Sequence, residues 1–132
     1  LNIFNKLWKN MKSILITGAA SGIGAATVKK LASKNVYFTL TTKSNLEGLN
    51  SVIQFAENKG AKVKYVCGDL SKRKFLKELV LEHSNETGSN LSKKIIDDFE
   101  NELKNFVQVC PKEMIDKLKN PISTKTKIKK VS

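Results

Sequence analysis

The sequence predicts an α/β fold in which a three-stranded parallel sheet (βαβαβ) precedes a helical C-terminal segment. Short apolar runs at 13–17, 36–41 and 61–67 are typical of strands, and stretches of helical periodicity at 22–33 and 45–58 separate them. A glycine-rich turn joins the first strand to the first helix. Connections this short require right-handed crossovers and parallel strands, so we expect the strand order 3-2-1.

Apolar positions mark the side of each element that we expect to face the core. The first strand is apolar and β-branched without alternation, which predicts burial on both faces. In the third strand, Val63, Tyr65 and Cys67 alternate with Lys62, Lys64 and Val66. The helices repeat apolar residues at three- and four-residue steps, with Val28 and Leu31 expected inward in the first, and Leu46, Leu49, Ile53 and Ala56 in the second.

The alternation of strand and helix stops after about residue 71. Helices are predicted at 72–84 and 91–105, with a loop at 85–90 between them. Residues 106–110 are predicted to be extended, and Pro111 suits the first turn of a third helix that ends near residue 120. The apolar sides of the first two of these helices hold Leu76, Leu79, Val80 and His83, then Ile95, Phe99, Leu103 and Phe106.

Four segments follow from these patterns: an N-terminal extension at 1–10, a partial α/β unit at 11–71, a helical segment at 72–120 and a basic, disordered tail at 121–132. Met11 directly precedes the first strand, so we interpret it as the natural start of the protein. The alternative for 1–10 is a helix that presents Leu1, Phe4 and Trp8 to a membrane surface or a partner.

Composition argues against several classes of protein. No apolar run approaches the ~20 residues that cross a membrane, and the N-terminus lacks the features of a secretory signal. The two cysteines, Cys67 and Cys110, lie far apart and form no metal-ligand or disulfide pattern. We therefore expect no metal site and a reducing, cytoplasmic location.

The formal net charge of +12 raises the question of a nucleic-acid partner. Among the 24 basic residues only Arg73 is an arginine, whereas contacts to base edges and phosphates favour arginine. We therefore expect a solvated lysine surface and disfavour nucleic-acid binding.

The glycine-rich turn at 18–24 carries the chemistry of the first half of the chain. A turn that binds phosphate between a strand and a helix needs residues without a Cβ atom at defined positions. Gly18 would allow the tight turn, Gly22 would let the backbone approach a pyrophosphate, and Gly24 would let helix and strand pack closely. The N–H groups that begin the helix would face the anion, together with the Ser21 hydroxyl.

The segment Thr17-Gly18-x-x-x-Gly22-Ile23-Gly24 resembles the TGxxxGIG signature of the short-chain dehydrogenase/reductase family, and Gly68-Asp69-Leu70 resembles that family's Asp–aliphatic pair. The resemblance covers residues 11–70 and implies a Rossmann-type dinucleotide-binding unit, truncated before its catalytic part. It also implies that the Asp69 carboxylate contacts the adenine amino group. The cofactor-binding residues implied in this way are Gly18, Ser21, Gly22, Ile23, Gly24, Asp69 and Leu70.

The end of the second strand bears on the choice of cofactor. An acidic residue about 20 positions beyond the glycines would bond the ribose 2′-hydroxyl of NAD, but the chain has Thr41-Thr42-Lys43-Ser44 there and no acid before Glu47. Lys43 and Ser44 suit a 2′-phosphate, so we expect NADP in preference to NAD. The alternative is that Lys43 is one more exposed lysine.

Members of the family that the chain resembles use a Tyr-x-x-x-Lys pair and a serine for proton transfer. Here Thr41 stands four residues after Tyr37, and Asp69 stands four after Tyr65, so neither tyrosine forms the pair. We assign no catalytic residue and expect negligible hydride transfer. The only histidine, His83, has no nucleophile beside it in the sequence and is expected to be structural.

A second resemblance concerns residues 76–118. The patterns His83-x-x-x-Thr87-Gly88-Ser89 and Phe106-Val107-x-Val109-x-Pro111 are similar to the C-terminal end of the large subunit of glutamate synthase, although Met114 stands where an aromatic residue is expected. Together the two resemblances imply a join between two gene products near 71–75, and the second implies a partner of the glutamate synthase type. The alternative is an ordinary amphipathic helical tail.

Three hypotheses for the function follow. The first is a dinucleotide-binding module with little or no catalysis, the second is a structural or interaction piece, and the third is a non-functional gene-fusion remnant. The dehydrogenases that the chain resembles continue the sheet beyond the first strand, so we expect that edge to be exposed and apolar. Phe99, Leu103 and Phe106 are candidates to cover it, and the same edge could join copies into a homo-oligomer.

Overall fold

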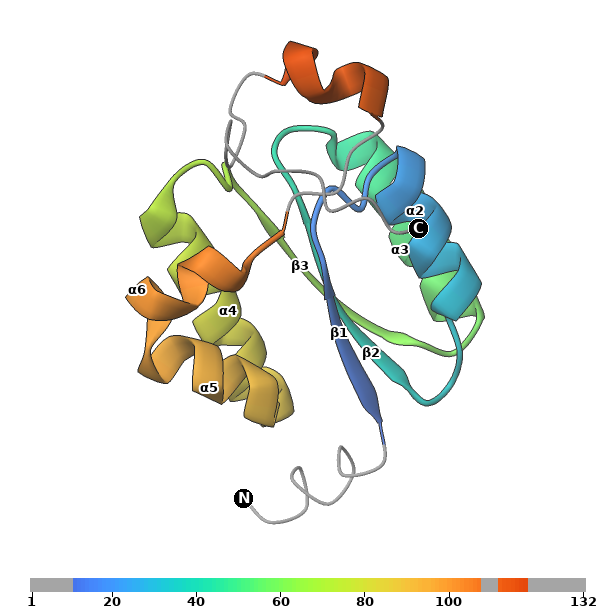
Figure 1. Ribbon diagram of the computed structural model, residues 1–132. Coiled ribbons are helices and arrows are strands. Elements are labelled where there is room, and N and C mark those ends of the chain that lie inside the picture. Colours follow the sequence, from blue (N-terminus) through green and yellow to red (C-terminus); the bar gives the residue numbers. More distant parts are fainter. Residues whose placement is uncertain (1–10, 108–111, 119–132) are drawn as a thin grey trace, which may run out of the picture. The chain divides into compact units, whose positions relative to one another are not determined.

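The computed structural model describes residues 11–107 and 112–118. The described residues fall into two compact units, which divide between Asp97 and Asp98. The first unit carries an open sheet formed by β1 (Lys12–Ile16), β2 (Val36–Thr42) and β3 (Lys62–Cys67), all of them parallel. Their order is β1-β2-β3 (Figure 1), which confirms the predicted α/β fold and the strand order 3-2-1.

Helices cover both faces of this sheet (Figure 1). α2 (Gly22–Leu31) follows β1 and α3 (Leu46–Asn58) follows β2, and both lie on one face. α4 (Arg73–Thr87) lies on the opposite face, and α5 (Asn90–Asp97) packs against α4. Helices on both faces are the usual cover of a parallel sheet.

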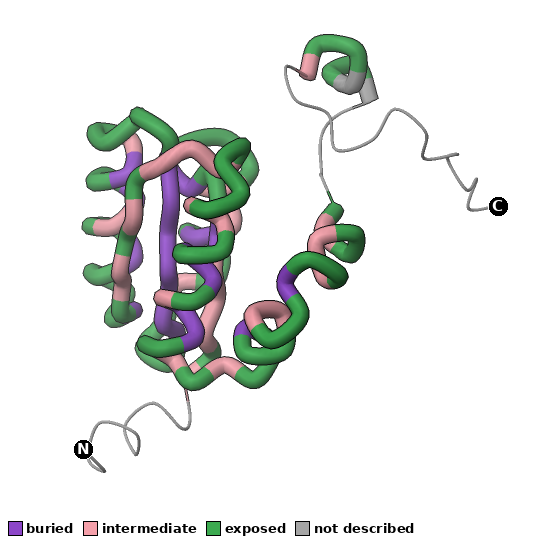
Figure 2. Tube along the Cα trace, turned by 90° about the vertical axis from the view of Figure 1, so that its left-hand side faces the viewer, coloured by how far each residue is buried: buried purple, intermediate pink, exposed green. Residues whose placement is uncertain are grey.

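The central strand β2 is buried along its whole length, as Figure 2 shows. Val36, Phe38 and Leu40 belong to the apolar core that α2 and α3 form on one face, where they join Val28 and Leu49. Burying a side chain of this size contributes about 1.5–3 kcal/mol, so this cluster is the main source of stability in the first unit.

The other face of β2 is polar and lies against α4. Thr39 contacts His83 of α4, and the Tyr37 hydroxyl donates to Oε2 of Glu86 at 3.5 Å. The alternation follows from the two-residue repeat of a strand. Within α4, Leu79, Val80 and His83 are buried, which agrees with the apolar side predicted for this helix.

Several residues expected inside are exposed. Leu31 ends α2 and Leu46 begins α3, so neither lies on the part of its helix that packs on the sheet. β1 and β3 are edge strands, which limits their burial. Only Ile16 of β1 is buried, and Tyr65 and Cys67 of β3 are exposed. The prediction that the first strand is buried on both faces is therefore wrong.

The loop predicted at 85–90 is also wrong, because α4 continues to Thr87. Inside the helix, the Thr87 hydroxyl donates to the carbonyl oxygen of His83 at 2.6 Å. The helix ends at Gly88, whose φ of 64° is left-handed and typical of a glycine that terminates a helix. The amide of Ser92 then donates to Oγ of Ser89 at 3.3 Å and caps the start of α5.

The second unit begins with α6 (Phe99–Glu102), which a 3-10 helix at Leu103–Asn105 follows. The continuous helix predicted at 91–105 is therefore interrupted. The break lies at Asp98, whose φ of −136° and ψ of 49° are not helical. The Glu102 amide donates to the carbonyl oxygen of Asp98 at 2.9 Å and so closes the first turn of a new helix. The Asp98 carboxylate accepts a hydrogen bond from the side-chain amide of Asn101 at 2.8 Å.

The remaining predictions for the C-terminal half are tested only in part. Residues 112–117 form a 3-10 helix rather than the α-helix expected after Pro111. The predictions for 1–10, 108–111 and 119–132, which include the extension, Pro111 and the basic tail, lie outside the described residues. Within the described ranges, no helix combines the length and apolarity needed to cross a membrane.

Candidate functional site

The carboxyl ends of the three strands meet at one edge of the sheet, where open parallel sheets bind their ligands. Two backbone hydrogen bonds hold the loops of this edge together. The amide of Ala19, in the glycine-rich turn after β1, donates to the carbonyl oxygen of Thr41 at 3.0 Å. The amide of Gly68, after β3, donates to the carbonyl oxygen of Thr42 at the same distance. The ends of β1, β2 and β3 are thereby fixed side by side.

The glycines of the turn lie where conformation or close contact favours a residue without a Cβ atom. Gly18 has a φ of 61° and Gly22 a φ of 52°, both in the left-handed region that favours glycine. At Gly24 the constraint is contact rather than conformation, because a Cβ atom there would lie 2.3 Å from the carbonyl oxygen of Gly18. The turn therefore closes back on the first residues of α2.

The first amides of α2 are left without partners. The first hydrogen bond that closes a turn of this helix runs from the Ala25 amide to the Ser21 carbonyl oxygen, at 3.1 Å. Among the described residues, no hydrogen bond engages the amides of Gly22, Ile23 or Gly24. The Ser21 side chain is exposed and does not cap the helix. A helix start of this kind offers several donors and a positive dipole end to an anion.

The ends of β2 and β3 bring two further predicted residues into contact. Nζ of Lys43 lies 2.8 Å from Oδ2 of Asp69, and the amide of Ser71 donates to Oδ1 of Asp69 at 2.9 Å. Lys43, and then Ser71, hold the pKa of the Asp69 carboxyl well below its usual range. Ser44 is exposed beside Lys43, and Leu70 follows Asp69 at the same edge. The sequence did not predict that Lys43 and Asp69 would pair with each other.

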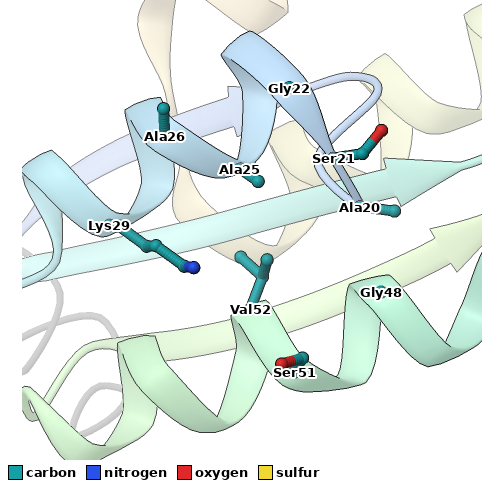
Figure 3. A pocket seen from close by; sticks show the side chains of 9 residues that line it. All are labelled: Ala20, Ser21, Gly22, Ala25, Ala26, Lys29, Gly48, Ser51 and Val52. Atoms are coloured by element: carbon teal, nitrogen blue, oxygen red, sulfur yellow. The ribbon is translucent and has the colours of Figure 1, made fainter.

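A hollow of about 410 Å³ lies between α2 and α3 and borders the glycine turn at Ser21 and Gly22 (Figure 3). The start of α3 approaches the glycine turn closely there because Gly48 has no side chain: a Cβ atom would lie 2.5 Å from the carbonyl oxygen of Ala20. We did not single out Gly48 from the sequence. The sequence feature that could have identified it is a glycine inside a predicted helix, which is unfavourable unless close packing requires it.

His83 lies on the opposite face of the sheet from this hollow. It is 3% exposed, and its Nδ1 atom lies 2.6 Å from Oγ1 of Thr39 in the middle of β2. Burial lowers the pKa of the His83 imidazole. Its surroundings are those of a packed residue, as the sequence analysis expected.

Two other polar side chains are informative because of their surroundings. The Tyr37 hydroxyl is directed to Glu86, and burial, followed by Glu86, raises the pKa of Tyr37. The buried Oγ1 atom of Thr41, near the carboxyl end of β2, has no hydrogen-bond partner among the described residues. Sequence analysis did not select Thr41. The only available signal was its position near the end of a strand otherwise expected to be apolar.

A family model described as short chain dehydrogenase matches residues 12–90 of the chain. The match starts with β1 and includes all of α4, so it extends past residue 70, where the sequence resemblance was expected to end. No curated protein matches the chain.

Solved structures of short-chain dehydrogenases are also similar. A metagenomic short-chain oxidoreductase in complex with NADP is 27% identical, with a TM-score of 0.53 over 58% of this chain and 34% of its own. A double mutant of a Serratia marcescens short-chain dehydrogenase/reductase is 27% identical, with a TM-score of 0.55 over 59% of this chain and 32% of its own. The chain thus spans about one third of the length of the solved structures that it matches.

Proposed function

Because this chain belongs to the short-chain dehydrogenase family, we propose that its α/β unit binds the adenosine diphosphate part of a nicotinamide dinucleotide, with NADP preferred over NAD. The observation that carries this proposal is the row of unpartnered amides at Gly22, Ile23 and Gly24. Aligned N–H groups at a helix start bind a pyrophosphate through backbone alone. The complex of the metagenomic relative with NADP supports the same class of ligand.

The residues around these amides fit such a ligand. Gly18 and Gly22 leave the turn open where side chains would stand, and the exposed Ser21 hydroxyl adds a donor for a pyrophosphate oxygen. The exposed Ile23 side chain, which is 66% accessible, would border the ligand. Gly24 acts indirectly, because it lets α2 start against the turn.

The adenosine part would extend from the glycine turn across the ends of β2 and β3. In this arrangement Lys43 and Ser44 contact the 2′-phosphate, which distinguishes NADP from NAD. Asp69 accepts the adenine amino group, and Leu70 lies beside the ring. The bound dinucleotide would supply or accept hydride at its nicotinamide, while every residue named here only binds and orients it.

We propose that this stretch of chain does not catalyse hydride transfer by itself. Neither tyrosine of the described chain is followed by a lysine at the fourth position. Tyr37 is 6% exposed and engaged by Glu86, and Tyr65 is an exposed residue of the edge strand β3. Among the described residues, neither tyrosine therefore has the lysine partner that would prepare it for proton transfer to a substrate oxygen.

Titration with NADPH, followed by the fluorescence of the nicotinamide, tests the proposal directly. We expect a saturable change, and a weaker one with NADH. Ser21→Ala keeps the backbone amides and removes one donor, so it should weaken binding of both nucleotides by about the same factor, roughly tenfold or less. The absence of a saturable change with millimolar NADPH, in a protein whose circular dichroism shows a folded sheet, would reject the proposal.

A second candidate function concerns the helical segment that follows the sheet. The similarity of residues 76–118 to the end of the glutamate synthase large subunit suggests docking to a partner of that type. The α4–α5 hairpin, closed at Gly88, supports an ordered surface for such docking. The family match reaches residue 90, so only the later part of this segment lies outside it. Pull-down of purified glutamate synthase subunits by the full chain tests this candidate.

Self-association and location complete the proposal. Among the described residues, β1 pairs only with β2, so one edge of the sheet is open to a strand of a second copy. Sedimentation velocity would show a defined dimer if copies join there, whereas aggregates alone would favour the gene-fusion remnant.

For the location of the protein, the absence of a disulfide pattern suggests the cytoplasm, which fractionation of cells would test.

A further inference from the structure

The Lys43–Asp69 ion pair lies at the edge of the sheet where the adenosine part of the cofactor is proposed to bind. Lys43 is the first residue after β2, and Asp69 is the second after β3. Both oxygens of the Asp69 carboxylate are engaged, Oδ2 by Lys43 at 2.8 Å and Oδ1 by the Ser71 amide at 2.9 Å. Each oxygen of the carboxylate that should accept a hydrogen bond from the adenine amino group therefore already has one partner.

From this geometry we propose that the Lys43–Asp69 pair is an exchange point: the 2′-phosphate of NADP takes Lys43 away from Asp69, and the released Oδ2 accepts the adenine amino group. This inference rests on the proposed function. It adds a contact that must break on binding, and it couples the recognition of the phosphate to the recognition of the base.

The chemistry of the three groups favours the exchange. A phosphate monoester carries a charge of about −1.5 to −2 near neutral pH and three acceptor oxygens, whereas Asp69 offers a single negative charge. The Lys43 side chain is 70% exposed, so its pair with Asp69 is screened by water and salt and is easily opened. Lys43 therefore loses little when it leaves Asp69, and it gains a more strongly charged partner.

NAD cannot drive the same exchange. A ribose 2′-hydroxyl is neutral, so it does not compete with a carboxylate for an ammonium group. Lys43 then stays on Asp69, and the adenine amino group has to share Oδ2 with the ammonium group. The preference for NADP would arise in two places at once, at the phosphate and at the base.

The test uses two small probes, 2′,5′-ADP and ADP, which differ only by the 2′-phosphate. The phosphorus NMR signal of the bound 2′-phosphate reports its own protonation, whose ordinary pKa is about 6. It is titrated on the wild-type chain and on Lys43→Met and Asp69→Asn. Lys62→Met is the matched control, because Lys62 is an exposed lysine at the start of β3.

We expect Lys43 to lower the pKa of the bound 2′-phosphate in the wild-type chain and in the control, and further in Asp69→Asn, which lacks the nearby negative charge. In Lys43→Met the pKa should no longer be lowered, and affinity for 2′,5′-ADP should fall about tenfold. Affinity for ADP should rise, because Oδ2 of Asp69 is then free to accept a hydrogen bond from the adenine amino group. A lowered pKa only in Asp69→Asn would show that Lys43 stays on Asp69 and would overturn the inference alone. Binding of neither probe would overturn the proposed function, and the inference with it.

Discussion

His83 and Thr39 join helix α4 to the central strand of the sheet: Nδ1 of His83 lies 2.6 Å from Oγ1 of Thr39, and both residues are buried. The hydroxyl donates to a neutral imidazole and accepts from a protonated one, so the contact can survive either state. The buried surroundings, however, disfavour the positive charge of the protonated imidazole. Burial alone accounts for the lowered pKa of His83, and the stability of this face should depend on pH.

We predict that the free energy of unfolding falls as the pH drops below about 6.5. The unfolded chain takes up a proton on His83 near that pH, whereas the folded chain resists protonation until a lower pH. The stabilisation is therefore fully present above pH 6.5, and it is lost at up to about 1.4 kcal/mol for each pH unit below it. Urea unfolding at a series of pH values between 8 and 5 measures this slope.

His83→Gln is the control for this slope. His83 is the only histidine of the chain, so no other imidazole titrates in the same window. The variant should be less stable at pH 8, because packing on β2 is altered, but its stability should hardly vary down to pH 5.5. An equal slope in both proteins would show that other groups cause the pH dependence.

A second prediction compares two glycines of the first unit. In Gly24→Ala the new Cβ atom would meet the carbonyl oxygen of Gly18 at 2.3 Å, and this backbone cannot move without opening the turn. We expect a loss of about 1–3 kcal/mol of stability, as for other overpacked sites, together with the loss of NADPH binding. Calorimetry and the fluorescence titration check the two effects.

Gly88→Ala provides the comparison. Gly88 has a φ of 64°, but a Cβ atom there meets nothing within 4 Å. The substitution should cost about 1–2 kcal/mol for the left-handed conformation and leave NADPH binding unchanged. If Gly24→Ala bound NADPH as tightly as Gly88→Ala, the glycine turn would not be the site of the pyrophosphate.

Much of the fold could be predicted from the sequence because it depends on local patterns. The alternation of apolar runs with helical periodicity locates β1, β2 and β3 to within about one residue of their observed bounds. The spacing of Leu79, Val80 and His83 identifies the buried side of α4. In the same way, the order of Gly18, Gly22 and Gly24 predicts a turn that the structure builds with two left-handed residues.

The remaining features depend on contacts between distant residues. Nothing near Lys43 in the sequence indicates that Asp69 will stand opposite it, because the pairing of β2 with β3 brings them together. Burial also depends on position in the sheet: Tyr65 belongs to an alternating strand but is 50% exposed because β3 is at an edge. The end of α4 was misplaced because the polar stretch 85–90 was interpreted as a loop, although the helix continues to Thr87 and Gly88 supplies the left-handed residue.

A third prediction concerns Lys64 of the edge strand β3, which forms ion pairs with two glutamates of α4. Its Nζ atom lies 2.9 Å from Oε1 of Glu82 and 3.1 Å from Oε1 of Glu86, and Glu82, followed by Glu86, raises the pKa of Lys64. All three side chains are partly exposed, so we expect Lys64→Met to lower stability by less than about 1 kcal/mol. The difference should shrink in 1 M salt, where charges are screened within about 3 Å.

Lys62→Met is the matched control for the ion pairs of Lys64, because it removes the same charge from an exposed position of the same strand. Its stability should stay within about 0.5 kcal/mol of the wild type at low salt. Urea unfolding at low and high salt measures both variants. A loss in Lys64→Met that is independent of salt would mean that the lysine acts through its aliphatic part, packed between β3 and α4.

The last prediction sets helix propensity against close packing at Gly48. Replacing a glycine inside a helix by alanine normally stabilises a protein by about 1 kcal/mol. Here the new Cβ atom would lie 2.5 Å from the carbonyl oxygen of Ala20, so α3 would have to move away from the glycine turn. We expect the cost of this steric contact to outweigh the gain in helix propensity, so Gly48→Ala should destabilise the chain by about 1–2 kcal/mol net.

Asn50→Ala, at an exposed position of the same helix, is the control. It should show the gain in helix propensity alone, about 0.5 kcal/mol. Thermal unfolding of both variants separates the effects: if Gly48→Ala were as stabilising as Asn50→Ala, α3 could shift freely, and the glycine turn would not depend on the position of that helix.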